Sequence, residues 1–182
     1  MQQSYATETM KRPAEQVRSL TSLSFPVYFV GDGVMLAGQP KPSEWRVLAQ
    51  QYHTVINIRS DPARAEVQRG VIEAVGMEQV YLPLPRELEA QHLQAFAEMV
   101  ERGQADGLIV HCRTASRTAL IWMLYRLLYH NWSEEQARDE LLQAGYEAER
   151  IAHFTLFVRQ YMQHMANKPG QAIAHGAFVA RA

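Results

Sequence analysis

A regular alternation of helix-like and strand-like segments through the middle of the chain constrains its fold most strongly. Helical spacing of apolar residues in 42–52, 63–75 and 89–103 alternates with short β-rich runs at 53–59, 78–84 and 106–111. A hairpin signal around a Gly-Asp-Gly turn at 31–33 precedes this alternation. Strands joined through helices form mostly parallel sheets that are covered on both faces. We therefore expect an α/β fold of three layers, with a central, mostly parallel sheet of four or five strands between helices.

The remainder of the chain is predicted to be helical, with loose ends. Residues 117–130 are apolar nearly all round, which predicts a central, buried helix. The segment 133–145 opens with a capping signal from Ser133 and Gln136 and stops at Gly145, and 147–165 reads as a last long helix. We expect one compact domain over 21–166, an N-terminal segment 1–20 that is loose or forms a short helix opened by Pro13, and a C-terminal tail over 167–182.

Charge and cysteine usage narrow the class of partner and the compartment. The formal net charge of the 182 residues is -1, so no basic field favours nucleic acid or an anionic membrane surface. The longest apolar run, "TALIWMLYRLLYH", is shorter than the ~20 residues that span a bilayer. The N-terminus has no apolar signal sequence, and a single cysteine fits a reducing cytoplasm. We expect a cytoplasmic protein without nucleic-acid or membrane partners.

Polar side chains follow the predicted strands at their carboxyl ends, which is where α/β sheets bind ligands. Arginines 59, 86, 113 and 117 should gather at this rim and make it cationic although the chain as a whole is nearly neutral. The residues that directly follow strands are Gln39, Arg59, Asp61, Arg86, Glu87 and Cys112.

The stretch "HCRTASRT", residues 111–118, contains the only cysteine of the chain. A strand, a tight loop and a helix start point several backbone N–H groups at one place, where the helix dipole adds positive charge. Arg117 could clamp two oxygens of a bound tetrahedral dianion, and the same field favours the thiolate of Cys112. Such a thiolate could attack phosphorus and form a phosphocysteine that water hydrolyses.

Four motifs, in order, carry a family resemblance: "LAGQP", "VINIR", "YLPLP" and "HCRTASRT". The last resembles the signature of the cysteine-dependent protein tyrosine and dual-specificity phosphatases. The set of four is more similar to a bacterial group of phosphatase-like proteins with a loop one residue shorter, a domain also found fused to β-lactamase-like hydrolases. The resemblance covers roughly residues 25–165.

The resemblance implies a role for each residue of the loop. Cys112 would be the nucleophile and Arg117 the phosphate clamp, while Thr118 would hydrogen-bond the thiolate. His111 would organise the loop from behind, with Gln39 and Arg59 as supporting residues. It implies a phosphorylated protein or small molecule as substrate, and neither a cofactor nor a metal. The cradle would be formed by the amides of Arg113, Thr114, Ala115, Ser116 and Arg117.

Two departures from the family pattern bear on activity. Ala115 stands where the family has glycine, and a positive φ there would cost alanine ~1 kcal/mol or more. The loop that usually supplies an aspartate as general acid reads "LPLPRELEA" here and has none. Protonation of the leaving group is worth ~10²–10⁴ in rate. Glu87 and Glu89 on that loop, and Asp61 at the rim, are the candidate acids, although each also suits a turn or a helix start.

Three alternative interpretations remain open at this stage. A lone cysteine at a strand end can be a buried small hydrophobe. The six-residue span from Cys112 to Arg117 is also the loop length of rhodanese-like sulfurtransferases, whose cysteine carries a persulfide. Ala115 and the missing aspartate would also suit a non-catalytic phosphate-binding module.

Overall fold

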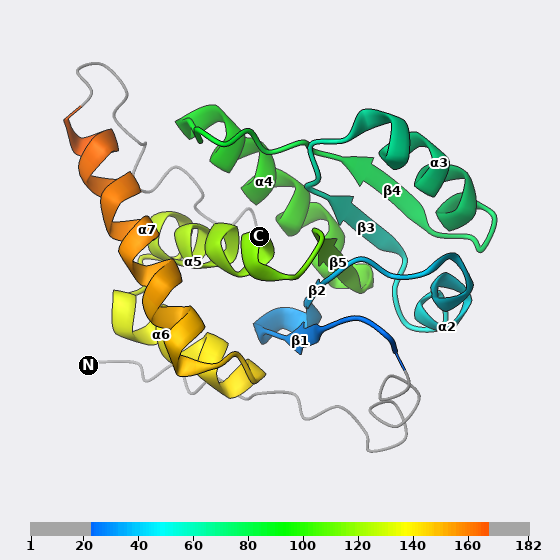
Figure 1. The fold of residues 1–182 in the computed structure, drawn as a ribbon, viewed down its shortest axis with the longest axis horizontal. Coiled ribbons are helices and arrows are strands. Elements are labelled where there is room, and N and C mark those ends of the chain that lie inside the picture. Colours follow the sequence, from blue (N-terminus) through cyan, green and yellow to red (C-terminus); the bar gives the residue numbers. More distant parts are fainter. Residues whose placement is uncertain (1–22, 168–182) are drawn as a thin grey trace.

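The structure, a computed structural model, describes residues 23–167. The expected short helix at Pro13, the N-terminal segment 1–20 and the tail after Asn167 lie outside these residues. Within them, five strands form one sheet in the order β1-β2-β5-β3-β4 (Figure 1). Only β1 runs antiparallel, paired with β2 through the predicted hairpin. The strands are β1 (Val27–Phe29), β2 (Met35–Ala37), β3 (Thr54–Asn57), β4 (Glu78–Tyr81) and β5 (Leu108–His111).

Helices cover both faces of the sheet, so the predicted three-layer α/β architecture is confirmed (Figure 1). Successive side chains of a strand enter opposite cores. Leu108 and Val110 of β5 join the core under α4–α7, whereas Ile109 joins the core under α2 and α3. The helices are α2 (Trp45–Leu48), α3 (Pro62–Glu73), α4 (Ala90–Gly103), α5 (Ser116–Tyr129), α6 (Glu134–Ala144) and α7 (Ala148–Ala166), with short 3-10 turns η1 (Gly31–Gly33), η2 (Pro42–Glu44) and η3 (Gln104–Asp106). No helix in the described part of the chain is long and apolar enough to cross a membrane.

Local signals explain where these helices begin and end. The side chain of Ser133 accepts a hydrogen bond from the Gln136 amide, and Gly145 closes α6 in the left-handed conformation, as the sequence predicts. The helix expected over 42–52 is much shorter. After Leu48 the amides of Gln50 and Gln51 bond three residues back, and the chain tightens into a turn that leads into β3.

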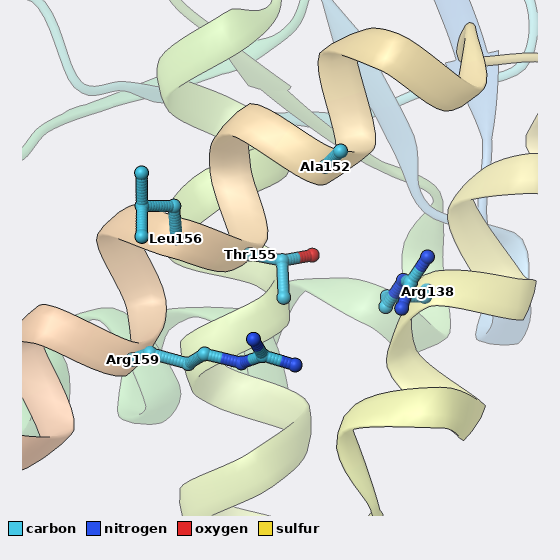
Figure 2. A pocket seen from close by; sticks show the side chains of 5 residues that line it. All are labelled: Arg138, Ala152, Thr155, Leu156 and Arg159. Carbon is cyan, nitrogen blue, oxygen red and sulfur yellow. The ribbon is translucent and has the colours of Figure 1, made fainter.

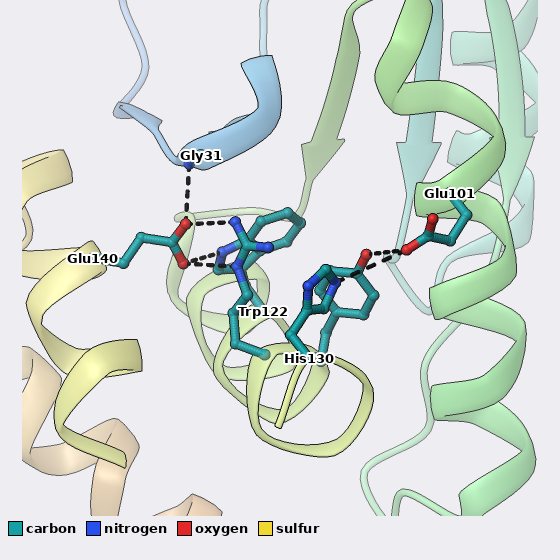
Figure 3. Close-up of polar contacts among 7 residues, drawn as sticks. Gly31, Glu101, Trp122, His130 and Glu140 are labelled. Atoms are coloured by element: carbon teal, nitrogen blue, oxygen red, sulfur yellow. Dashed lines mark hydrogen bonds and ion pairs between the residues drawn. The ribbon is translucent and has the colours of Figure 1, made fainter. Parts of the chain in front are cut away.

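The central helix α5 carries one charge into the core, and that charge is paired (Figure 3). Arg126 Nη2 lies 2.6 Å from Glu140 Oε1 of α6, with both side chains largely buried. Glu140 also accepts hydrogen bonds from Trp122 Nε1 at 2.7 Å and from the Gly31 amide at 3.0 Å. The buried carboxylate is therefore fully hydrogen-bonded, as such a charge requires. This contact joins α5, α6 and the β1–β2 connection, and it fixes the helix that begins at the candidate site.

Candidate active site

The site lies where β5 meets α5, at the carboxyl end of the parallel strands. Cys112 directly follows β5, and its amide donates to the Ala37 carbonyl at 3.1 Å. The Gln39 amide donates to the Arg113 carbonyl at 3.2 Å, so the end of β2 holds the loop from the side. Gly38 is required between them, because a Cβ there would come within 2.8 Å of the Pro26 ring. This accounts for the Ala-Gly-Gln motif ahead of the loop.

Cys112 lines a cleft of about 340 Å³. The thiol side chain is almost fully buried, and α5 begins beside it at Ser116, so first-turn amides and the positive end of the helix dipole face this region. Within residues 23–167, no acceptor forms a hydrogen bond with the backbone amides of Arg113, Thr114, Ser116 or Arg117. An anion is the ligand that such a set of free donors suits. The cleft is lined by Arg59, Ser60, Asp61, Cys112, Arg113, Thr114, Ser116 and Arg117.

Ala115 adopts the left-handed conformation, with φ 61° and ψ 6°. The positive φ at the position where the resembling family has glycine is thus present in this chain. Three donors converge on the Ala115 carbonyl: the Ala119 amide at 3.3 Å, Thr118 Oγ1 at 2.8 Å and Tyr146 Oη at 2.9 Å. These bonds hold the peptide in an orientation that alanine alone disfavours.

Thr118 therefore differs from the role that the resemblance implies. Its one hydroxyl proton goes to the Ala115 carbonyl, and the expected bond to the Cys112 sulfur is not made in this structure. The physical reason is position: Thr118 lies in the first turn of α5, where a hydroxyl readily reaches back to the carbonyl three residues earlier.

Two residues of the α6–α7 region support the loop and were not predicted. Tyr146 is buried, and its ring stacks on Tyr28 at 3.5 Å between centroids. Burial raises the pKa of Tyr146, which keeps its hydroxyl protonated as a donor. Arg150 Nη2 donates to Ser116 Oγ at 2.8 Å and Nη1 to the Tyr28 hydroxyl at 3.2 Å. In the sequence both residues look like ordinary helix-end residues, because their distance from Ala115 along the chain hides the contact.

A chain of side-chain hydrogen bonds reaches the loop from the α3 face. Arg59 Nη1 donates to Gln39 Oε1, Gln39 Nε2 donates to Gln68 Oε1 at 3.3 Å, and Gln68 Nε2 lies 2.8 Å from His111 Nε2. Because the amide nitrogen of Gln68 can only donate, His111 Nε2 accepts and the ring proton lies on Nδ1, which faces the Cys112 carbonyl at 3.5 Å. The predicted supporting residues thus meet in one network. Gln68, read only as part of a helix, is the member that the sequence did not reveal.

His111 is fully buried against Trp45, and it is neutral. Burial, together with the nearby positive charge of Arg59, lowers the pKa of His111 to about 3. A neutral ring can accept from Gln68 and donate toward the loop at the same time, which a protonated ring cannot do.

The predicted carboxylates and arginines separate clearly in space. Asp61 lines the cleft, where its side chain also caps α3 through the Arg64 amide at 3.1 Å. Glu87 and Arg86 are exposed, and neither lines the cleft. Both residues follow β4, an edge strand that β3 separates from β5. Glu89 does not line the cleft either. It is the N-cap residue of α4, where its backbone amide donates to His92 Nδ1 at 3.0 Å.

A second hollow lies between α6 and α7 and is lined by Arg138, Ala152, Thr155, Leu156 and Arg159 (Figure 2). It measures about 260 Å³, and the one hydroxyl that lines it, Thr155 Oγ1, donates to the Ile151 carbonyl at 2.8 Å. Arg159 Nε is already paired with Glu134 Oε2 at 2.6 Å. Among the described residues no three His, Cys, Asp or Glu side chains are grouped so that they could hold a metal ion. The cleft at Cys112 is therefore the candidate site.

Comparison with solved structures identifies the fold. A protein of Shewanella putrefaciens CN-32 described as a candidate phosphatase (DUF442) aligns with a TM-score of 0.60 and 18% identity, over 80% of this chain and 98% of that one. TpbA of P. aeruginosa aligns with a TM-score of 0.58 and 17% identity, over 79% of this chain and 92% of TpbA. PTPMT1 aligns with a TM-score of 0.55 and 18% identity, over 79% of this chain and 100% of PTPMT1. The fold is that of the cysteine-dependent phosphatases. No family model matches the sequence, and no curated protein matches it either.

The left-handed backbone at Ala115 gives a first prediction. Ala115→Gly should change the free energy of unfolding by no more than about 1 kcal/mol, because relief of the positive φ is offset by the greater freedom of glycine in the unfolded chain. Anion affinity should hold or rise. Ala115→Val, β-branched and buried, should cost roughly 1–3 kcal/mol and weaken anion binding. Urea unfolding and vanadate titration measure both effects, and a clear loss of affinity in the glycine variant would refute the strain argument.

The buried histidine gives a second prediction, on acid stability. The unfolded chain takes up a proton on His111 below about pH 6.5, whereas the folded chain resists protonation down to about pH 3. The contribution of neutral His111 to the free energy of unfolding is fully present above pH 6.5. It falls as the pH drops, and the loss at pH 5 is about 2 kcal/mol. His111→Asn should be less stable at pH 7 but should lose less on acidification. Denaturant unfolding at pH 5 and pH 7 tests this, and equal losses in both proteins would contradict it.

Proposed function

We propose that this protein is a cysteine-dependent phosphatase that hydrolyses phosphate monoesters through a phosphocysteine. The observation that carries the proposal is the placement of Cys112 in a cleft between free backbone amides and Arg117, at the start of α5. The fold of its structural neighbours supports the same reaction class. One TpbA structure holds phosphotyrosine, which supports a phosphorylated substrate.

The proposed reaction has two steps. The Cys112 thiolate attacks phosphorus, an S–P bond forms, the ester P–O bond breaks, and the leaving oxygen takes a proton from a general acid. Water then attacks the phosphocysteine and gives a proton back to the same group, the S–P bond breaks, and inorganic phosphate leaves with the thiolate and the acid restored. The loop amides and Arg117 stabilise the charge on the equatorial oxygens in both steps.

Asp61 is the proposed general acid, because it is the one carboxylate that lines the cleft in the described part of the chain. Its side chain caps α3 and lies 3.2 Å from the exposed Arg64 guanidinium, and it still lines the cleft. Glu87, another sequence candidate, is exposed and does not line the cleft, so it is the weaker candidate for this role.

The finer family assignment is also part of the proposal. The four ordered motifs and the short span from Cys112 to Arg117 support the bacterial phosphatase-like group whose loop is one residue shorter, with the domain over 21–166. The rhodanese-like and non-catalytic alternatives are kept as outcomes of the tests below.

The first test is hydrolysis of p-nitrophenyl phosphate, whose good leaving group does not require an acid. Wild type should turn it over, and Cys112→Ser should abolish turnover while retaining vanadate binding, because the amide cradle survives. Arg117→Ala should weaken both. Wild type that binds oxyanions without turnover would indicate a non-catalytic module, and transfer of sulfur from thiosulfate to cyanide would indicate a sulfurtransferase.

The second test concerns the acid. Asp61→Asn should slow hydrolysis of an alkyl phosphate by ~10²-fold or more and that of p-nitrophenyl phosphate far less, since only the poor leaving group needs the proton. Glu87→Gln is the matched control and should leave both rates unchanged. The loss of cap charge in Asp61→Asn is small, because asparagine also caps helices well. Equal effects of Asp61→Asn on both substrates would remove Asp61 from the role.

A further inference from the structure

The cleft at Cys112 carries more positive charge than one phosphate ester requires. Three guanidinium groups line it, from Arg59, Arg113 and Arg117, and none forms an ion pair within residues 23–167. The lining carboxylate, Asp61, is already paired with Arg64, 3.2 Å from Nε to Oδ2. The amides and Arg117 account for the phosphate that is transferred. The guanidinium groups of Arg59 and Arg113 are not needed to bind that phosphate.

Arg59 is held in place without losing its charge. Its backbone amide donates to Asn57 Oδ1 at 3.1 Å, and Nη1 donates to the Gln39 side-chain oxygen. Both acceptors are neutral amides, so the guanidinium is positioned but not neutralised. A fixed cation of this kind binds a second anion at little entropic cost.

The lining also indicates what the rest of the ligand must be like. Small-molecule pockets are mostly apolar and measure ~300–1,000 Å³, whereas this cleft of about 340 Å³ is lined by arginine, serine, threonine, aspartate and cysteine only. No ring or aliphatic side chain of the described residues lines it to pack against an aromatic or acyl leaving group. The cleft therefore suits a small, hydrophilic molecule.

We infer that the cleft selects small, hydrophilic phosphate esters that carry a second phosphate, with Arg59 and Arg113 binding the second group while Arg117 holds the one that is transferred. This inference rests on the proposed phosphatase activity for its kinetic test. The binding of the second phosphate can be measured without turnover.

The experiment compares the bisphosphate and the monophosphate of fructose, with release of inorganic phosphate as the readout. Wild type should show a kcat/KM for the bisphosphate at least about tenfold higher, the value of one hydrogen bond to a charged group. Arg59→Gln and Arg113→Gln should each reduce this ratio severalfold. Arg113 is exposed, so its variant tests the inference even if Arg59→Gln is poorly folded. Arg86→Gln, an exposed arginine outside the cleft, is the control and should keep the ratio.

The outcomes distinguish failure of the second phosphate site from failure of the proposed phosphatase activity. If p-nitrophenyl phosphate is hydrolysed but the two fructose esters react equally, or the ratio survives in both arginine variants, the second phosphate site is overturned while the phosphatase stands. If nothing is hydrolysed, the proposed function falls, and calorimetric titration of Cys112→Ser with both esters decides the site. Tighter binding of the bisphosphate supports it, and equal binding overturns it.

A phosphorylated lipid head group would offer the same two phosphates. Turnover of free inositol bisphosphate is therefore compared with that of phosphatidylinositol monophosphate in phosphatidylcholine vesicles. We expect the free head group to react faster, because the lining offers no apolar surface to acyl chains. Faster reaction of the vesicle-bound lipid would overturn the assignment to small soluble esters.

Discussion

The carbonyl oxygen of Ala115 is the point on which the site depends. The loop after Cys112 must turn sharply so that its amides and the start of α5 face one region, and the turn places Ala115 at a positive φ. Three hydrogen bonds to that one oxygen hold the turn, and two come from side chains, Thr118 and Tyr146. Glycine would adopt this conformation freely, whereas here neighbouring side chains stabilise it. An unusual residue at a strained position is thus compatible with a formed cradle.

The buried arginine of the core is paired with a carboxylate, whereas the arginines of the cleft are not. In the core, Arg126 meets a carboxylate that is fully hydrogen-bonded, and the pair joins three elements. In the cleft, Arg59, Arg113 and Arg117 have no carboxylate partner among the described residues. A paired charge stabilises an arrangement, and an unpaired one at a cavity is available to a ligand. The contrast is what separates the structural arginine from the proposed functional ones.

Much of the fold could be predicted because its signals are local. The alternation of apolar periodicity, the capping residue Ser133 and the glycine stop at 145 are each recognised within a few residues of sequence. The position of Cys112 beside Arg117 follows from one loop. Gln68, Tyr146 and Arg150 could not be found in this way, because each reaches the loop from an element distant in sequence and looks there like a residue of an ordinary helix end or face. The local pattern also does not show that Glu87 and Arg86 lie outside the cleft lining, because it does not determine the strand order that puts β3 between β4 and β5.

Hydrogen bonds hold the loop at Cys112 from both faces of the sheet. Gln68 and His111 lie on the α3 side, and Tyr146 and Arg150 lie on the α7 side. Many catalytic loops open by themselves while the rest of a domain stays folded. This loop cannot detach without breaking contacts to both helical layers, each of which belongs to a hydrophobic core. The cradle should therefore melt with the whole domain rather than ahead of it, so that loss of ligand binding on heating and loss of tertiary structure become one cooperative event.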